Sequence, residues 1–324
     1  MCYSSRIEAD YRRYLRDTGA SLSLHDFRLF FWERSQGRKV KVPRALEDAF
    51  LAGTSDVEGE IAALIRAHRE AESLKLQQDL FAQRARLTEA ERKLAVKHTK
   101  TAAESKRIAQ GKIENYVKAL RGEVADGGSR IYPFTYAPVV IVKDGERIVV
   151  PMRYHLRPAG ASPYFDKEFD GCYNARRNNV RKFWRRQFGH SHGVALWHDF
   201  YEHVDQGSKD VVLEFTPSGK PLMTVACLYS YWTPPPGSRE PAFWSFAAVT
   251  DEPPPEVAAA GHDRCIIPLR PEHLETWLNP DPANLEAFVH QEALGISAAL
   301  RPASGAGRRH GVPGACSHAR PVSH

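Results

Sequence analysis

The chain has 324 residues and a formal net charge of +6, with 42% hydrophobic and 26% charged residues. This length exceeds the usual single domain of about 100 to 200 residues, so we expect two domains or one large domain with an insertion. No stretch approaches the roughly 18 apolar residues that span a bilayer, and the first thirty residues lack the apolar segment of a secretion signal. The excess of basic over acidic residues suits an anionic partner such as nucleic acid, although an excess of this size is also ordinary for an enzyme.

Cysteine usage indicates a reducing compartment. The five cysteines are scattered, odd in number and never arranged as CxxC, which argues against a disulfide framework or a zinc ribbon. Cys172, Cys227 and Cys265 have aromatic or β-branched neighbours, so we expect them to fill space in the core.

The first part of the chain predicts helices. The stretch "ADYRRYLRDTG" indicates a helix that ends at Gly19, and "LHDFRLFFWERSQG" indicates another that ends at Gly37. Residues 59–121 contain no proline and are rich in Ala, Leu, Glu, Gln, Lys and Arg, which predicts one or two long helices. Their excess of basic residues fits either an accessory surface for a phosphate backbone or an ordinary solvated helix face.

The second half predicts a sheet. The stretch "APVVIVKDGERIVVPMRY" contains two β-branched runs around Asp144-Gly145, which indicates a hairpin. Short β segments dominate from Tyr132 to about Leu278, with a few helices between them. From about Arg301 the chain is rich in Gly, Pro, Ser, Ala, Arg and His and has no apolar period, so we expect disorder there.

A cysteine stands directly behind the initiator methionine. If Met1 is removed, Cys2 carries a free α-amine and a thiol on neighbouring carbons, a pairing that no internal cysteine has. The alternative is that the residue at position 2 is there by chance.

Glu202 is a candidate for proton transfer. Its neighbours Trp197, Phe200 and Tyr201 predict an aromatic pocket, where loss of solvent raises the pKa of a carboxyl toward neutrality. A strand-edge glutamate that points to water is the competing interpretation.

Two further groups are candidates for binding or catalysis. Asn174 and Arg176 are two residues apart and so share one side of an extended segment, where arginine can bind a phosphate and asparagine can orient a carbonyl or hydroxyl. Arg177 and Arg181 would enlarge this basic patch. His262 precedes an apolar run and is either a catalytic residue or a hydrogen-bonded structural one.

The stretch "FGHSHG" invites a metal site, because His190 and His192 could share one face of a strand. No third ligand is obvious nearby, so we expect a packing role and no metal.

These residues together resemble a known family. Cys2 behind Met1, "NAR" at 174–176, "FYE" at 200–202 and "HDR" at 262–264 before an apolar strand occur in the order typical of the SRAP family, the SOS-response-associated peptidases that sense abasic sites in DNA. The similarity covers Met1 to about Gly37 and Tyr132 to about Pro282. It implies an α+β fold with a mainly antiparallel, barrel-like β core and flanking helices. We expect a catalytic core at 1–40 and 130–285, a basic helical insertion at 59–122 and a disordered tail at 300–324.

The resemblance also implies roles for individual residues. The catalytic residues would be Cys2, Asn174, Glu202 and His262, and the DNA-binding residues Arg176, Arg264, Arg177 and Tyr154. Two departures stand out. Tyr3-Ser4 replaces the Gly-Arg that usually follows the cysteine, so that Arg6 becomes a candidate for the missing phosphate contact. Tyr154-His155 replaces Trp-Gly, so that Tyr154 is the nearest substitute for an aromatic ring that stacks on a base.

The implied function is a sensor of abasic sites in single-stranded DNA. Cys2 would form a thiazolidine crosslink that shields the lesion during the SOS response, after the same site, acting as a peptidase, had removed Met1; weak lyase activity would accompany it. No cofactor and no membrane are expected, and we expect a cytoplasmic, nucleoid-associated monomer. Two alternatives remain: an N-terminal-nucleophile amidohydrolase or cysteine peptidase that acts on proteins, and a non-enzymatic nucleic-acid binder.

Overall fold

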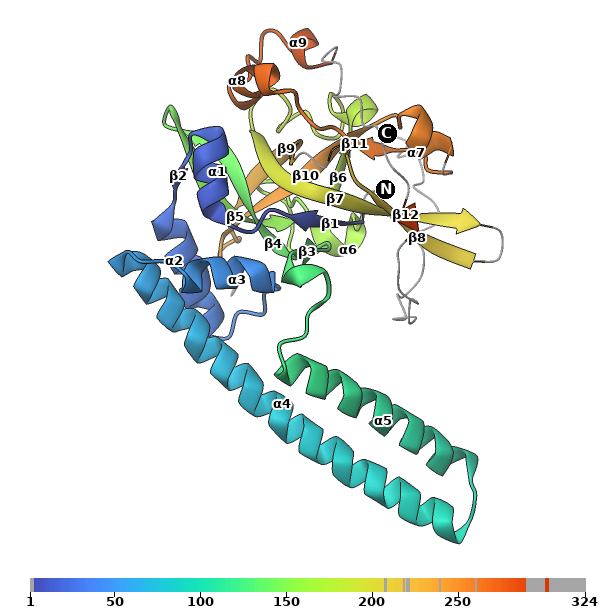
Figure 1. Cartoon of the computed structure of the whole chain (residues 1–324). Helices are drawn as coiled ribbons and strands as arrows, with labels where there is room; N and C mark the ends of the chain where they lie inside the picture. Colours follow the sequence, from blue (N-terminus) through green and yellow to red (C-terminus); the bar gives the residue numbers. More distant parts are fainter. Residues whose placement is uncertain are drawn as a thin grey trace.

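A computed structural model describes residues 3–206, 209–217, 219, 222–238, 240–259, 261–289 and 301–302 (Figure 1). Cys2 and almost all of the tail predicted to be disordered lie outside the described residues. The helices are α1 (Tyr11–Thr18), α2 (Leu24–Ser35), α3 (Arg44–Leu51), α4 (Asp56–Val96), α5 (Lys100–Leu120), α6 (Phe165–Glu168), α7 (Pro255–Ala259), α8 (Leu274–Leu278) and α9 (Glu286–Val289). The strands are β1 (Ser4–Ile7), β2 (Ser21–Leu22), β3 (Arg130–Ile131), β4 (Tyr136–Lys143), β5 (Glu146–Tyr154), β6 (Asn174–Arg176), β7 (His192–Gln206), β8 (Lys209–Phe215), β9 (Met223–Trp232), β10 (Phe243–Asp251), β11 (Cys265–Ile266) and β12 (Arg301–Pro302).

The predicted α+β fold with a mainly antiparallel barrel is confirmed. Around the barrel, β4 pairs with β5, β5 with β10, β10 with β9, β9 with β7, and β7 again with β4, which closes the ring. The β5–β10 pairing is parallel and the other four are antiparallel. Beyond the ring, β1 and β8 flank the far end of β7, while β6 and β11 flank the end of β10.

Closure of the barrel depends on a glycine. Gly193 lies in β7 where that strand crosses β4, and a Cβ atom at this position would stand only 2.9 Å from the carbonyl oxygen of Val140. Since real Cβ atoms do not approach a backbone oxygen so closely, a larger residue would force the two strands apart.

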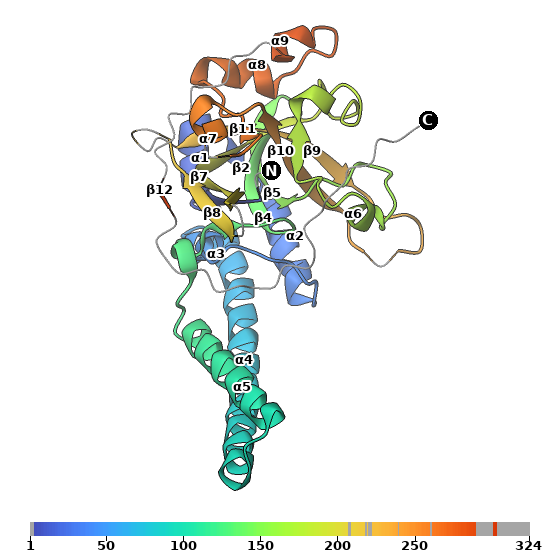
Figure 2. The same ribbon diagram turned by 90° about the vertical axis from the view of Figure 1, so that its right-hand side faces the viewer.

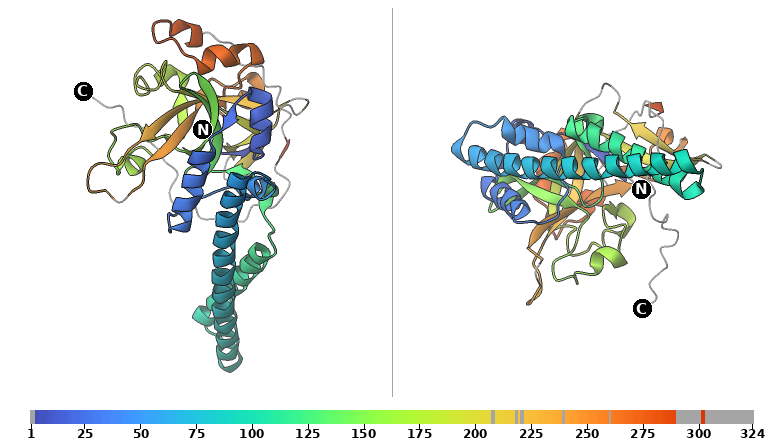
Figure 3. Two further views of the ribbon diagram at one scale, coloured as in Figure 1. Left: turned by 90° about the vertical axis from the view of Figure 1, so that its left-hand side faces the viewer. Right: turned by 90° about the horizontal axis from the view of Figure 1, so that it is seen from below.

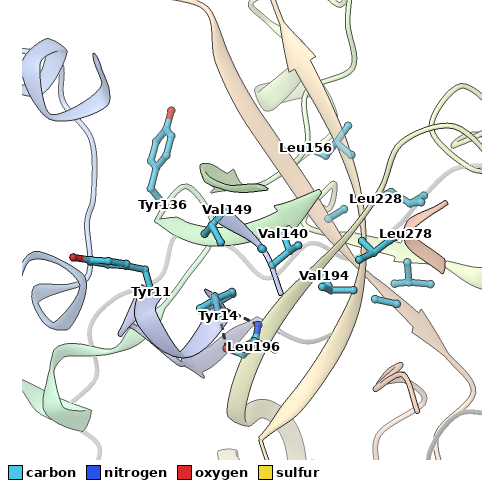
Figure 4. Close-up of a cluster of buried hydrophobic side chains, with 14 of the residues drawn as sticks. Tyr11, Tyr14, Tyr136, Val140, Val149, Leu156, Val194, Leu196, Leu228 and Leu278 are labelled. Atoms are coloured by element: carbon cyan, nitrogen blue, oxygen red, sulfur yellow. Dashed lines mark hydrogen bonds between the residues drawn. The ribbon is translucent and has the colours of Figure 1, made fainter. Parts of the chain in front are cut away.

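Alternate residues of the barrel strands belong to two hydrophobic clusters. Val140, Val194 and Leu196 pack in one cluster with residues of α1, α2 and α3, which therefore cover the outer face (Figure 4). The other cluster contains Trp197 and Phe246 but no residue of these helices, and it fills the inner face.

Tyr14 joins α1 to the barrel at this outer face. Its hydroxyl accepts a hydrogen bond from the backbone N–H of Leu196 at 3.1 Å and lies 3.4 Å from the carbonyl oxygen of the same residue (Figure 4). The side chain is completely buried, so this contact satisfies a hydroxyl that water cannot reach.

The local predictions for turns and helix ends are confirmed. Helix α1 ends at Gly19, whose φ of 66° is the left-handed conformation that glycine adopts without strain. The β4–β5 hairpin turns at Asp144 and Gly145 with φ of 54° and 83°, as expected for a two-residue turn. Helix α3 was not predicted from the sequence.

The long helices α4 and α5 form an antiparallel pair, here called the arm, that projects from the barrel (Figures 2 and 3). Ser55 and Glu58 cap the start of α4 reciprocally, and Ile61 and Ile65 are buried where α4 leaves the body. An ion-pair network anchors this base: the carboxylate of Glu47 in α3 binds the guanidinium groups of Arg34 in α2 and Arg69 in α4.

Candidate active site

Glu202 lies where β7 runs beyond the barrel. It follows Phe200 by two residues and so points to the same side as that member of the inner cluster. Its side chain is completely buried, and burial raises the pKa of its carboxyl to about 8. The interpretation of Glu202 as a buried carboxyl is therefore correct, and the water-facing alternative is wrong.

His262 lies against this carboxyl. The residue comes from the segment after α7, and its Nε2 atom is 3.1 Å from Oε2 of Glu202. Only 8% of the side chain is exposed. Sixty residues of sequence separate the two groups, so this contact exists only because the strands bring β7 and the end of β10 together.

The backbone of Arg264 orients the imidazole. Nδ1 of His262 lies 2.9 Å from the carbonyl oxygen of Arg264 and 3.3 Å from the backbone nitrogen of the same residue. Nε2 faces the carboxyl of Glu202. Burial lowers the pKa of His262 to about 4 and raises that of Glu202 to about 8, so burial favours the neutral imidazole and the neutral acid.

Asn174 and Arg176 stand on β6, which lies beside the second half of β10. Asn174 is opposite Ala248, a member of the inner cluster, and Arg176 is opposite Thr250. The segment is extended, as predicted, so both side chains point to the same side. Asn174 is buried and Arg176 is partly exposed.

Arg264 and Arg177 border the same region. Arg264 directly precedes β11, which pairs with β10, and it is largely buried. The guanidinium of Arg177 forms an ion pair with Asp251 at the end of β10. The structure thus brings Arg176, Arg177 and Arg264 to one end of β10, although Arg264 is far from the other two in sequence.

The N-terminal strand runs along β7 toward Glu202. Ser4 pairs with Tyr201 and Ser5 with Phe200 in an antiparallel register. Continuing this register by one residue places Tyr3 opposite Glu202. Tyr3 also meets Tyr132 and Tyr173 edge to face, with ring centroids 5.9 Å and 6.1 Å apart.

The predicted stacking role of Tyr154 needs correction. Its ring is completely buried, stacked on Phe246 and in edge contact with Trp197 and Tyr173. The cause is the barrel itself, because Tyr154 ends β5 on the inner face, so that no side of the ring is open to a base.

The structure offers exposed aromatic rings nearby that sequence reasoning missed. Tyr132 and Phe134 follow β3 and are 39% and 38% exposed. The guanidinium of Arg130 lies 5.2 Å from the ring centre of Tyr132 and donates to Ser4 at 2.9 Å. The signal in the sequence was "RIYPF", two exposed aromatic residues around a proline just before a strand.

Phe134 is held in a strained conformation. Its φ is 71°, which is rare for a residue with a bulky side chain, and its ring stacks at 4.5 Å on His155, whose φ is 140°. The backbone N–H of Phe134 donates to the carbonyl oxygen of Tyr154 at 2.6 Å. His155 occupies the place where the family pattern has glycine, which is consistent with its left-handed φ.

Other predicted candidates have structural partners. Nε of Arg6 donates to Oδ2 of Asp199 at 2.8 Å. The guanidinium is therefore occupied by this carboxylate and not by a phosphate. His192 is stacked on Trp277, with Nδ1 3.0 Å from the carbonyl oxygen of that residue, and its Nε2 accepts from the N–H of Gly189. Within the described residues no cluster of three or more His, Cys, Asp or Glu side chains could hold a metal ion.

Cys172, Cys227 and Cys265 are buried, as predicted for core residues. Burial raises the pKa of the Cys172 thiol to about 12 and raises that of Cys227 and Cys265 further. These thiols are therefore protonated and poor nucleophiles at neutral pH.

The fold and the site together define the class of protein. It is a closed barrel with a buried Glu–His pair at the end of its N-terminal strand, and arginines surround this pair. The family model described as SOS response associated peptidase (SRAP) matches residues 91–301, more than half of the chain. The chain belongs to this family. Membership supports, at the level of the family, a DNA-damage-associated role in binding abasic sites. The match includes every predicted site residue except Cys2 and Arg6.

Solved structures that are similar to part of this chain were also found. A protein from Bacteroides thetaiotaomicron is 16% identical, with a TM-score of 0.44, over 53% of this chain and 76% of its own. A protein from Bordetella bronchiseptica is 19% identical, with a TM-score of 0.45, over 53% and 87%. A phage-related protein from the same organism is 17% identical, with a TM-score of 0.43, over 59% and 90%. No curated protein matched the chain. Among the described residues, no helix is long and apolar enough to cross a membrane.

Proposed function

We propose that the protein captures abasic sites in single-stranded DNA covalently, through Cys2 after removal of Met1. The observation that carries the proposal is the position of the Glu202–His262 pair beside the N-terminal strand. The β1–β7 register sets Tyr3 opposite Glu202. Residue 2 is bonded to Tyr3, and consecutive Cα atoms are 3.8 Å apart.

The chemistry requires an amine and a thiol on neighbouring carbons. An abasic deoxyribose opens to an aldehyde, and the neutral α-amine, with an ordinary pKa of about 7.7 to 8.0, attacks its carbon. Loss of one water gives an imine. The thiol then adds across the C=N bond, its sulfur to carbon and its proton to nitrogen, which closes the five-membered thiazolidine ring. Overall one water is released and no electrons are exchanged.

Glu202 and His262 would move the protons of these steps. A carboxyl with a pKa of about 8 is protonated at neutral pH, so it can donate to the ring oxygen as the sugar opens and to the hydroxyl that leaves as water. His262, whose Nε2 lies 3.1 Å from Oε2 of Glu202, would take up or supply a proton in the neighbouring step. Its own orientation is fixed by Arg264.

The surrounding residues would position the strand. Arg176 and Arg264 can bind the phosphates on either side of the lesion, with Arg177 adding positive charge, and Asn174 can orient the sugar hydroxyl or the amine. The exposed ring of Tyr132 can stack on the adjoining base in the place of the buried Tyr154. Met1 removal as a peptidase activity, and weak lyase activity through β-elimination of the imine, belong to the same proposal.

The test compares Cys2→Ser with the wild-type protein on an abasic single-stranded oligonucleotide. The serine variant, used after its mass has shown that Met1 is removed, keeps the α-amine of residue 2 but loses the thiol, so an imine can form and no thiazolidine can close. We expect a band that survives denaturing electrophoresis for the wild type without reductant, and for Cys2→Ser only after borohydride reduction. A stable band from Cys2→Ser without reductant would contradict the thiazolidine. An uncleaved N-terminal extension should abolish both bands, whereas a pure nucleic-acid binder would keep its affinity.

A further inference from the structure

The outer part of the arm is strongly basic. Residues 84–121 contain eleven Lys and Arg against four Asp and Glu, an excess of seven, whereas the complete chain has a net charge of +6. The base of α4, residues 56–83, is instead acidic, with three Lys and Arg against six Asp and Glu. A charge excess concentrated at the outer end of a projecting element points to an anionic partner that this end meets.

The arm stands clear of the barrel. Beyond its base, the second half of α4 packs against α5 through small buried residues, Ala90 on α4 and Ala102 and Ala109 on α5. Figures 2 and 3 show the paired helices projecting away from the barrel. Apart from this contact between the two helices, the surface of the helix pair is accessible.

One side of α5 presents cations outward. Lys100, Arg107 and Lys118 are separated by seven and eleven residues, close to whole helical turns, so they lie on one side of α5. This side is opposite to the buried Ala102 and Ala109. All three cations are exposed.

Acidic residues neutralise only part of this side. Glu104 and Glu114 share it, and the carboxylate of Glu104 binds Arg107. In the described part of the chain, neither Lys100 nor Lys118 forms an ion pair with an acidic side chain. Lys97, at the tip, and Lys112, on the flank of α5, also have no ion pair there. These cations are available to an external anion.

We propose that the arm binds the phosphate backbone of duplex DNA next to the single strand held at the candidate active site. The proposal rests on the proposed function, because it takes the DNA from that site. Helix α5 has 21 residues and, at 1.5 Å per residue, is roughly 30 Å long, the length of about nine base pairs at 3.4 Å each. A straight rod with cations along its length fits a regular duplex backbone. A protein partner would need an apolar contact area on the arm, and the cationic side of α5 does not present one.

The experiment measures binding to an undamaged duplex of about twenty base pairs by fluorescence anisotropy at several salt concentrations. The arm variant combines Lys100→Gln, Arg107→Gln and Lys118→Gln. The control variant combines Lys39→Gln, Lys41→Gln and Lys143→Gln, three exposed lysines outside the arm, and changes the net charge equally. Glutamine is a good helix former, and circular dichroism checks that the arm variant remains folded.

We expect the arm variant to bind the duplex at least tenfold more weakly than the wild type. The slope of log K against log salt should fall by about two to three, because each lost phosphate contact contributes about 0.9. The control variant should match the wild type, and the arm variant should still capture a short abasic single strand. Unchanged duplex affinity and slope in the arm variant, or an equal loss in the control, would overturn the proposal. A wild type that binds duplex but never captures abasic DNA would contradict the proposed function alone.

Discussion

Oε2 of Glu202 lies 3.1 Å from Nε2 of His262, and the carboxyl has no exposed surface. Burial of both groups favours the neutral acid and the neutral imidazole. Because the pKa of Glu202 is about 8, its carboxyl can give up and take back a proton near neutral pH. The predictions below follow from this pair and from the residues around it.

Glu202→Gln should change the pH dependence of capture. In the wild type the rate should rise as the α-amine loses its proton, near pH 8, and fall again as Glu202 loses its own with a pKa of about 8. Glutamine cannot titrate, so the variant should lose the alkaline limb and react about 10²- to 10⁴-fold more slowly. Single-turnover capture rates between pH 5.5 and 10 check this. An alkaline limb that persists in Glu202→Gln would assign it to another group.

Burial of Glu202 should also make folding depend on pH. A carboxyl whose pKa is higher in the folded state binds more protons there, so stability falls as pH rises toward 8. The lowered pKa of His262 acts in the opposite direction between about pH 4 and 6.5, and only the Glu202 effect remains above that window. From pH 6.5 to 8 the wild type should lose on the order of 2 kcal/mol relative to Glu202→Gln. Urea unfolding at both pH values measures the difference; parallel changes in the two proteins would contradict it.

Tyr132 should contribute to binding of the strand. Stacking of one base on an aromatic ring is worth about 1 to 3 kcal/mol, so Tyr132→Ala should weaken binding to an undamaged single strand by roughly 5- to 150-fold. Tyr132→Phe keeps the ring and should bind like the wild type. Equilibrium binding measured for all three proteins decides the matter. Equal losses in both variants would indicate a role for the hydroxyl, and no loss in Tyr132→Ala would exclude stacking.

Glu47 should hold the base of the arm to the body. Its carboxylate is buried between Arg34 and Arg69, so Glu47→Ala leaves the buried Arg34 without its partner. Such a loss typically costs about 3 to 5 kcal/mol. Replacing both residues, as Arg34→Met with Glu47→Leu, should restore much of the stability. Denaturant unfolding measures each variant, and a cost below about 1 kcal/mol for Glu47→Ala would show that the network is dispensable.

The local structure could be predicted from sequence patterns. The glycine that ends α1, the Asp144-Gly145 hairpin and the long proline-free helices depend on residues close together in the chain, which is where propensities act. The closing β5–β10 pairing joins Arg153 to Ser245, and no local pattern specifies such a contact. The barrel was therefore expected from the family resemblance alone.

The site could be predicted in part. The aromatic neighbours of Glu202 correctly indicated its burial, and the spacing of Asn174 and Arg176 correctly indicated a shared side. Alternation in β5 could not tell which side of the strand faces the inside of the barrel, so Tyr154 was wrongly expected to be open to a base. Exposure of Tyr132 depends on the turn after β3, which ties its N–H to the hydroxyl of Thr135 and is not encoded by a recognisable motif.

Intact mass spectrometry of the purified protein, with and without an abasic single-stranded oligonucleotide, tests the central claim most directly. The protein alone should have the mass of the chain without Met1. With the oligonucleotide, a second species should appear at the sum of the two masses less one water, and only when Cys2 is present. A protein that retains Met1, or a mixture in which no such species forms, would contradict the account.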